Sequence, residues 1–245
     1  MRMTRVHVEL SLVAGSEIEL PDNAANHLTR VLRLGVGDTC ALFNGDGHDH
    51  PARLIEVGKR VVRVAVGDGI AIDNESPLRL NLLQGVARGE KMDLILQKAT
   101  ELGVVAVHPL YSQRSEVKLV GARADKRVAH WRGVVVSACE QSGRSRVPDV
   151  SMPLPLGQVL AALPEGGLRL LLDPDAAISL SRLIVDPMQP IQLAVGPEGG
   201  WSAQDQAQLH AVGFNGLRLG PRVLRTETAG LVAISALQAL HGDLR

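Results

Sequence analysis

The sequence predicts an α/β fold in which a small β-rich domain precedes a larger domain built on a parallel sheet. Before about residue 72, short β-branched segments alternate with turns; after it, near-continuous apolar runs alternate with helical patterns. Runs such as Leu168–Leu172 have no polar face, which is typical of parallel strands buried on both sides. Two further runs, Ile191–Val195 and Leu217–Leu219, lead into glycine-bearing loops, where open α/β sheets bind ligands.

Residues 1–72 are expected to form a small barrel of five strands and one helix. The expected strands are Val6–Leu10, Glu17–Leu20, Thr39–Phe43, Ala52–Val57 and Val61–Val66. The expected helix runs from a cap at Asp22 to Leu34, with Ala25, Leu28, Val31 and Leu32 on its buried side. His27, Arg30 and Arg33 recur on it at three-residue spacing and therefore share a face. That face is either a contact for the RNA backbone or an exposed polar stripe.

The segment Asn44–His50 contains Asp46, His48, Asp49 and His50, a composition that suggests a metal site. Asn-Gly and Asp-Gly between two strand-like runs are, however, strong hairpin signals. Adjacent side chains on a tight turn also converge poorly on one ion. We therefore predict a turn and no metal.

Residues 67–77 are polar, rich in glycine and end in proline, which predicts a linker and two domains, 1–72 and 73–245. The second domain begins with a strand at Leu78–Val86 and a helix that Gly103 ends. The elements expected after it are a strand at Val104–Leu110, a helix at Arg123–Gln141, a proline-rich loop at Val147–Gly157, a short helix at Gln158–Leu163, the strands named above, and a helix at Thr226–His241 whose first turn carries a capping hydroxyl.

Composition excludes several classes of protein. The formal net charge of the chain is zero, but residues 88–146 hold 11 Lys and Arg against 6 Asp and Glu. This basic stretch forms either a phosphate-binding face or a solvated helix surface. Aromatic residues make up 2% of the chain, too few for a base-stacking platform. Two isolated cysteines, no apolar leader and no apolar run of membrane-spanning length indicate a cytoplasmic protein.

The two glycine-bearing loops are the main candidates for a ligand site. Gly196-Pro-Glu-Gly-Gly lacks a lysine and carries a carboxylate at its centre, so it is a poor cradle for polyphosphate. A cationic or zwitterionic ligand with an apolar base fits better, because Leu219, Val223 and Leu224 would form an apolar wall. Two arginines are candidates for chemistry: Arg114, after the strand that ends at Leu110, and Arg144, where a helix ends. For Arg144, neutralising the helix dipole is an alternative role.

These residues resemble a known family. Gly196-Pro-Glu-Gly-Gly and Leu219-Gly-x-x-x-Leu-Arg-Thr-Glu-Thr-Ala resemble the cofactor loops of the SPOUT, or trefoil-knot, methyltransferases. Together with Lys91–Gly103, Gln113-Arg-Ser-Glu and Ala138–Arg144, they make the chain similar over its full length to the 16S ribosomal RNA (uracil-N3)-methyltransferase family. The N-terminal segment resembles that family's PUA-like domain.

The resemblance implies S-adenosylmethionine as methyl donor, a deep knot, and methylation of N3 of a uridine in the 16S ribosomal RNA of the small subunit. The implied cofactor-binding residues are Leu172, Gly196, Pro197, Glu198, Gly199, Gly200, Leu219, Gly220, Val223, Leu224, Arg225, Thr226, Glu227, Thr228 and Ala229. The expected RNA contacts are Arg5, His27, Arg30, Arg33, Arg88 and Lys91.

Methylation at N3 requires loss of a weakly acidic proton or anionic character at the uracil. Arg114 and Arg144 are the candidate catalytic cations, and Glu198, Glu140 or Glu227 is either a general base or a partner of the cofactor's amine. The resemblance also implies a homodimer, and the largely apolar helix Thr226–His241 would lie at its interface or inside the monomer. Two alternatives stay open: a non-catalytic RNA-binding protein, and a knotted methyltransferase for transfer RNA or a ribose 2′-hydroxyl.

Overall fold

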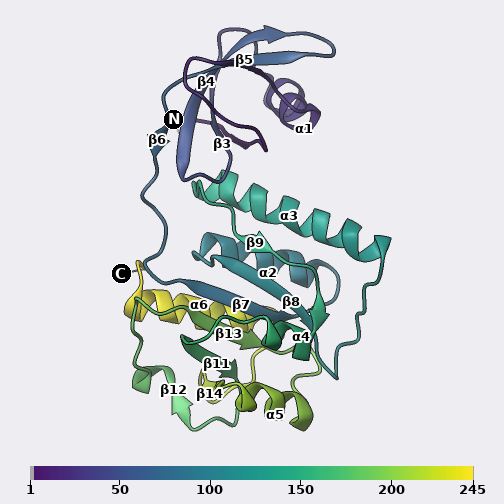
Figure 1. The fold of residues 1–245 in the computed structure, drawn as a ribbon, viewed down its shortest axis with the longest axis vertical. Helices are drawn as coiled ribbons and strands as arrows, with labels where there is room; N and C mark the ends of the chain where they lie inside the picture. Colours follow the sequence, from purple (N-terminus) through teal and green to yellow (C-terminus); the bar gives the residue numbers. More distant parts are fainter. Residues whose placement is uncertain (1–2, 245) are drawn as a thin grey trace. The chain divides into compact units, whose positions relative to one another are not determined.

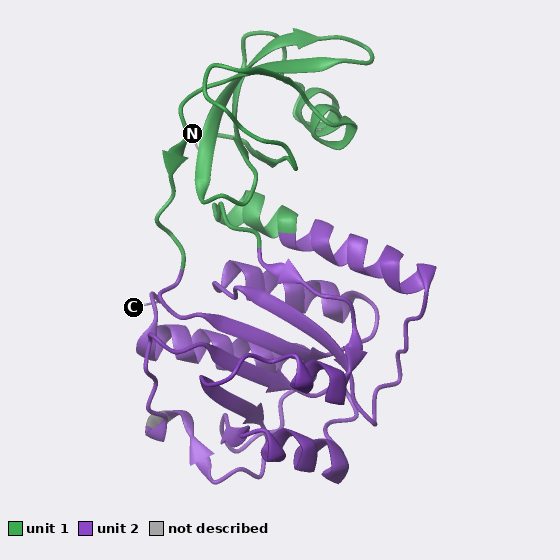
Figure 2. Ribbon diagram, viewed as in Figure 1, with its two compact units in different colours: residues 1–75, 136–147 green, residues 76–135, 148–245 purple. Residues whose placement is uncertain are grey.

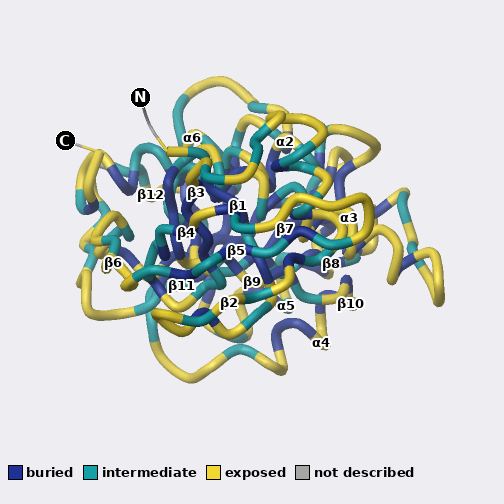
Figure 3. The backbone as a smooth tube through the Cα atoms, turned by 90° about the horizontal axis from the view of Figure 1, so that it is seen from above, coloured by how far each residue is buried: buried dark blue, intermediate teal, exposed yellow. Residues whose placement is uncertain are grey.

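The computed structural model describes residues 3–244, which form two compact units (Figures 1 and 2). Unit 1 contains residues up to Glu75 together with Val136–Val147, and unit 2 contains Ser76–Val135 and the chain from Pro148 onward. The division at 75/76 lies three residues after the predicted one. The sequence also gave no sign that the end of the long helix belongs with the N-terminal unit. In both units the buried positions follow the strands, and the exposed positions concentrate in the loops (Figure 3).

Unit 1 is a six-stranded sheet with one helical segment. Its elements are β1 (Arg5–His7), β2 (Glu17–Glu19), α1 (Asp22–Asn26), the π-helix η1 (His27–Val31), β3 (Thr39–Phe43), β4 (His48–Val57), β5 (Val62–Val66) and β6 (Ile70–Ala71). The strand order is β1-β3-β4-β5-β2, with β6 on β4; the β1–β3 pair is parallel and the others are antiparallel. The alternating residues of these strands, such as Leu42, Leu54 and Val64, fill its core.

The helix of unit 1 differs from the expectation. Pro21, not Asp22, precedes its first turn, and from His27 the helix widens into a π-helix, with Leu32 N–H donating to His27 O at 3.0 Å. The wider turn shifts the later side chains around the axis. Val31 and Leu32 are consequently exposed, at 67% and 38%, instead of buried. Leu28 is buried as predicted, and Ala24 is buried as well.

The turn between β3 and β4 is confirmed. Gly45 and Gly47 adopt φ values of 95° and 91°, which side chains disfavour, and β4 starts directly afterwards at His48. Asp46 accepts a hydrogen bond from the His48 N–H at 2.8 Å, where the turn enters β4. Within residues 3–244 no group of three or more His, Cys, Asp or Glu side chains could hold a metal ion.

Unit 2 is an eight-stranded sheet with helices on both faces. Its elements are β7 (Leu80–Gly85), α2 (Glu90–Glu101), β8 (Ala106–Tyr111), α3 (Ala122–Ser142, whose end belongs to unit 1), β9 (Asp149–Val150), β10 (Leu154–Pro155), α4 (Leu156–Ala161), β11 (Leu168–Leu172), β12 (Ile178–Ser179), the 3₁₀ helix η2 (Leu180–Arg182), β13 (Ile191–Val195), α5 (Ala203–Ala211), β14 (Asn215–Arg218) and α6 (Thr226–His241). The order is β10-β8-β7-β13-β11-β14-β12, with β9 on β8. The described strand pairs are all parallel, as predicted.

Along the central strands, successive side chains point to opposite faces of this sheet. Leu83, Leu171 and Ala194 pack with α4 and α5. Gln84 and Val195 point to the other face, where they lie beside Gly230 of α6. Helix α2 packs against α6 on that side. The sheet is therefore buried on both faces, which explains the continuous apolar runs.

Candidate functional site

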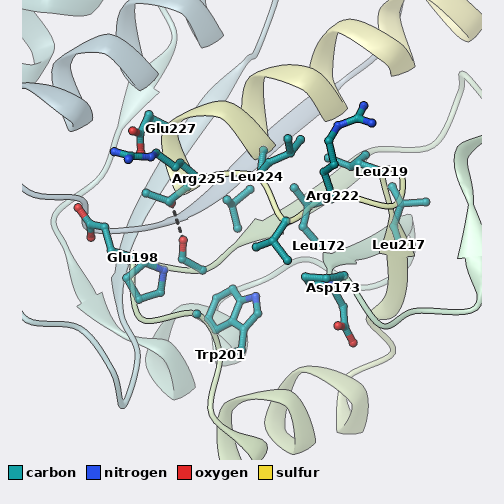
Figure 4. A pocket seen from close by; sticks show the side chains of 18 of the residues that line it. Leu172, Asp173, Glu198, Trp201, Leu217, Leu219, Arg222, Leu224, Arg225 and Glu227 are labelled. Carbon is teal, nitrogen blue, oxygen red and sulfur yellow. Dashed lines mark hydrogen bonds between the residues drawn. The ribbon is translucent and has the colours of Figure 1, made fainter.

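A cavity of about 520 Å³ lies in unit 2 at the carboxyl ends of β11, β13 and β14 (Figure 4). Strands β13 and β14 both pair with β11 in parallel, so their three following loops meet at one edge of the sheet. The lining residues are Lys91, Leu172, Asp173, Pro174, Asp175, Val195, Gly196, Pro197, Glu198, Gly200, Trp201, Gln206, Leu217, Leu219, Gly220, Arg222, Val223, Leu224, Arg225, Thr226, Glu227 and Ala229.

The loop after β13 is packed closely against the end of β7. A Cβ placed on Gly85 would lie 2.5 Å from Pro197 N and 2.9 Å from Gly196 C, closer than side chains tolerate. Glycine at position 85 therefore allows the two backbones to touch. This contact fixes one wall of the cavity.

Helix α6 is joined to the same loop by buried hydrogen bonds. The Thr226 hydroxyl donates to Gly196 O at 2.5 Å and accepts from Gln84 Nε2 at 3.0 Å. The sequence predicted a capping hydroxyl in this turn, but Arg225 is the residue that precedes the helix, and Thr226 bonds across the cavity instead. The network joins β7, the loop after β13 and α6, segments that are far apart in the sequence.

The walls of the cavity combine apolar and acidic groups. Leu172 and Leu224 lie at its centre, with the indole of Trp201 beneath them in the view of Figure 4. The carboxylates of Glu198 and Glu227 stand on one side and that of Asp173 on the other. A cavity with leucines, an aromatic ring and carboxylates suits a cationic ligand that carries an apolar ring.

Lys91 lies between two of these carboxylates. Its Nζ is 3.3 Å from Glu198 Oε1 and 3.8 Å from Glu227 Oε2. Burial alone raises the pKa of Glu198, but hydrogen bonds from the Arg88 N–H, its own N–H and Lys91 outweigh burial and hold that pKa below its ordinary value. Glu198 is thus an anion that ties the loop to the start of α2, and a weak proton acceptor.

Glu227 is placed differently from Glu198. Its Oε2 is buried and accepts no hydrogen bond from any residue between 3 and 244, although the Lys91 ammonium is within ion-pair distance. It sits in the first turn of α6, where the helix dipole favours a negative charge. Glu227 therefore has a buried oxygen that a ligand in the cavity could engage.

The cavity gathers thirteen of the fifteen residues predicted to bind the cofactor, the exceptions being Gly199 and Thr228. Gly199 faces outward and packs on Arg114, while Thr228 lies on the exposed side of α6. Sequence reasoning missed Asp173, Trp201 and Arg222, which also line the cavity. Asp173 carried a usable signal, because it directly follows the apolar strand β11.

Arg114 lies beside this cavity. Its Nη1 donates to Gly199 O at 3.2 Å, and its side chain is exposed. The preceding residue is held by α5, because Gln113 N–H donates to Asp205 Oδ1 at 3.1 Å. Asp205 in turn forms a capping box with Ser202 at the start of α5. Arg114 is thus an exposed cation on a well-anchored loop.

Arg144 and Arg5 are buried within unit 1. Arg144 is 4% exposed and its Nη2 lies 2.5 Å from Glu75 Oε2. Arg5 is 7% exposed, pairs with Asp49 at 2.7 Å, and stacks on Phe43 with its guanidinium 4.5 Å from the ring centroid. These contacts give both side chains a structural role within unit 1.

The remaining predicted residues are more accessible. Arg30 and Arg33 are exposed on unit 1, and Arg33 has a φ of 59°, which places it after the helix and off the face predicted for it. His27 is half-buried, and Glu140, the third predicted carboxylate, accepts the His7 N–H in the same unit. Arg88 is exposed and paired with Glu116. Lys91 belongs to the cavity, as described above.

Two further observations concern chemistry outside the cavity. Burial raises the pKa of both Cys40 and Cys139 to about 11, so these thiols are poor nucleophiles. Among the helices of residues 3–244, none has the length and apolarity needed to span a membrane.

Comparison with known proteins defines the class first. A sequence model described as RNA methyltransferase domain matches residues 74–238, and one described as RNA methyltransferase PUA domain matches residues 20–66. The structure is similar to a ribosomal RNA small subunit methyltransferase E from Neisseria gonorrhoeae, solved bound to S-adenosylmethionine, with 40% identity, a TM-score of 0.94 and full coverage of both chains.

Two other relatives indicate the same class of protein. A putative methyltransferase from Legionella pneumophila, solved with S-adenosylmethionine, is 36% identical with a TM-score of 0.94 over 99% of this chain and 100% of that one. The ribosomal RNA small subunit methyltransferase E of Mycobacterium bovis is 32% identical over 87% of this chain and 83% of its own. The chain belongs to the family of ribosomal RNA small subunit methyltransferases E, as the sequence predicted.

Proposed function

We propose that this protein transfers a methyl group from S-adenosylmethionine to N3 of a uridine in the ribosomal RNA of the small subunit. The observation that carries the proposal is the cavity at the ends of β11, β13 and β14, in a chain 40% identical to a relative solved with that cofactor. The position of the methylated atom rests on the family resemblance of the two loops.

The cavity fits S-adenosylmethionine in size and chemistry. About 520 Å³ lies within the range of small-molecule sites. Leucines from three segments can enclose the adenine, and backbone groups of the glycine-bearing loops can hydrogen-bond to its edge. The buried Oε2 of Glu227 accepts no hydrogen bond from the described residues and lies 3.8 Å from the Lys91 ammonium, so it can also pair with a cationic group of the ligand. When bound, the cofactor supplies an electrophilic methyl group.

Residues on three loops would hold the donor. Asp173 directly follows β11 and can accept hydrogen bonds from ribose hydroxyls. Glu227 supplies negative charge at the α6 end of the cavity, and Lys91 keeps Glu198 paired so that the loop stays in place. All fifteen predicted cofactor-binding positions lie on the segments that border the cavity, so we retain them as donor-site residues.

Arg114 is the proposed catalytic cation for the acceptor. Its guanidinium lies next to the donor loop, exposed to an incoming base. Uracil develops negative charge on its oxygens as N3 loses its proton, and a fixed guanidinium stabilises that charge. Glu227 is the candidate proton acceptor or donor-amine partner, because one of its oxygens accepts no hydrogen bond from the described residues.

We also propose that two copies pair through the outer side of α6. Leu94 of α2 and Val232 of α6 are 42% and 39% exposed and border an apolar hollow that includes Thr228 and Leu231. Apolar faces of this kind mark protein interfaces. The hollow also contains Glu227, so a partner seated there would border the donor cavity. We further propose the trefoil knot expected from the family resemblance.

Unit 1 is proposed to bind RNA through its exposed cations. Arg30 and Arg33 are exposed, whereas Arg5 is engaged inside the unit. Such contacts to phosphate would make binding salt-dependent. The substrate and the two buried, unpaired thiols suit a cytoplasmic protein.

Methyl transfer to small ribosomal subunits tests this function. Arg114→Ala is expected to lower kcat by about 10²-fold, in line with removal of one charge-stabilising donor, while the Kd for S-adenosylmethionine stays unchanged. Arg79→Ala, an exposed arginine at the opposite edge of the sheet, serves as the matched control. Full turnover of Arg114→Ala would remove the assignment, and methyl incorporation at a ribose or in transfer RNA would contradict the proposed acceptor.

A further inference from the structure

A second hollow in unit 2, of about 470 Å³, is lined by cations. We call it the basic groove. It is formed by the segment after β7, by the loop before α3 and by the first half of α3. Its residues are Val86, Ala87, Arg88, Gly89, Val117, Leu119, Arg123, Lys126, Arg127, His130 and Trp131.

Helix α3 places its cations on one side. Arg123 lies three residues before Lys126 and four before Arg127, so these three side chains are neighbours on the helix, over a length of about 6 Å. The side chains of Arg123, Lys126 and Arg127 are exposed, and no ion pair to an acidic side chain is found for them within residues 3–244. Like charges at this spacing repel each other, and a bound anion would relieve that repulsion.

Two other polar side chains that line the groove already have acidic partners. Arg88 is matched with Glu116, and His130 Nε2 lies 2.7 Å from Asp93 Oδ2. Glu116 and Asp93 are therefore already engaged at the edges of the groove. Arg123, Lys126 and Arg127 of α3 remain to bind a ligand. Arginine forks match the oxygens of a phosphate group particularly well.

The floor of the groove contains an unused hydrogen-bond donor. Trp131 is 1% exposed, lines the groove, and its Nε1 has no partner among the described residues. Buried indole N–H groups usually find an acceptor. An anionic or hydroxyl oxygen bound in the groove would supply one.

A single short segment separates the basic groove from the donor cavity. The side chain of Arg88 borders the groove, while its backbone N–H donates to Glu198 Oε1 of the donor cavity at 3.0 Å. Lys91, one turn further along, lines the donor cavity. A strand bound in the groove would therefore lie next to the place where a methyl group is transferred.

We infer that the basic groove binds the sugar–phosphate backbone of the substrate RNA, next to the nucleotide that is methylated. This inference rests on the proposed function. Phosphates would pair with Arg123, Lys126 and Arg127, and the Trp131 N–H would donate to a phosphate or ribose oxygen. Contacts of this kind position a strand without reading its sequence.

The test uses the full chain and small ribosomal subunits from a strain that lacks the family's methyltransferase. The variant Arg123→Gln/Arg127→Gln removes two groove charges and keeps side-chain length. Arg79→Gln/Arg182→Gln removes two exposed charges elsewhere in unit 2 and is the matched control. Filter binding at several KCl concentrations gives the affinity and its salt slope, and calorimetry gives the Kd for S-adenosylmethionine.

The groove variant is expected to bind subunits about tenfold or more weakly, with a salt slope reduced by about 1.4, which corresponds to two lost contacts to single-stranded phosphates. Its Kd for S-adenosylmethionine should match that of the wild type, because neither arginine lines the donor cavity. Trp131→Phe, which keeps an aromatic ring but loses the N–H, should weaken binding about two- to tenfold.

Wild-type affinity and salt slope in the groove variant would overturn the inference. So would displacement of the subunits by polyglutamate as efficiently as by RNA of equal charge, because the groove would then accept acidic polymers generally. Methyl incorporation by the wild-type protein is measured separately. Its absence would contradict the proposed function, and the binding measurements would still decide what the groove holds.

Discussion

Replacing Gly85 by alanine should weaken binding of the methyl donor without unfolding the protein. The new Cβ would lie 2.5 Å from Pro197 N, whereas ordinary contacts begin at about 3.4 Å, so the loop after β13 must shift by about 1 Å. Overpacking of this size costs about 1–3 kcal/mol. Because the loop must return to its place to bind the donor, the Kd for S-adenosylmethionine should rise about 10- to 100-fold.

Isothermal titration calorimetry with S-adenosylmethionine measures this effect. Gly133→Ala is the matched control, because a Cβ at that exposed position of α3 meets nothing within 4 Å. It should leave the Kd unchanged and stabilise the helix by about 0.5–1 kcal/mol. A wild-type Kd for Gly85→Ala would refute the account of the cavity wall, since the contact between Gly85 and Pro197 would then not determine the loop's position.

Three further predictions concern stability. Thr226→Val should lower the free energy of unfolding, measured by chemical denaturation, by about 1–3 kcal/mol, because Gln84 loses a buried hydrogen-bond partner. The substitution of the exposed Thr228 by Val should change that free energy little. Equal effects of the two substitutions would contradict the role of the network. Ser202→Ala should cost about 0.5–2 kcal/mol through loss of the α5 capping box, and an unchanged denaturation midpoint would contradict it. Burial lowers the pKa of His7 and His108, so both imidazoles bind protons more readily in the unfolded chain. The protein should therefore keep its full stability above about pH 6.5 and lose stability below that pH. Thermal unfolding of the wild type and of His108→Asn at pH 7.5 and 5.5 measures this loss.

Elements with strong local patterns could be predicted from the sequence. Strands Leu168–Leu172 and Ile191–Val195 and helix Thr226–His241 have the predicted bounds, because continuous apolar runs, or a long apolar helix after a glycine-bearing loop, leave few other structures. The family was predicted from motifs in the two glycine-bearing loops and in three earlier segments of the chain, and it is confirmed.

Features that depend on distant contacts could not be predicted. The π-helix at His27–Val31 has the side-chain pattern of an ordinary helix, and only its hydrogen bonds distinguish it. Arg144 follows a helix end, as a catalytic arginine could, but its partner Glu75 lies 69 residues away in the sequence. The sequence leaves the basic stretch 88–146 as either a phosphate-binding face or a solvated surface, and only the fold shows that cations of α3 line a hollow with the buried Trp131.

The central claim is that the cavity holds a methyl donor for a uridine of small-subunit RNA. Small subunits from a strain lacking the family's enzyme can be incubated with the protein and isotope-labelled S-adenosylmethionine, and their RNA digested for mass spectrometry. The account predicts one labelled methyl group per subunit, at N3 of a single uridine. No label in the RNA, or label only on ribose hydroxyls, would contradict it.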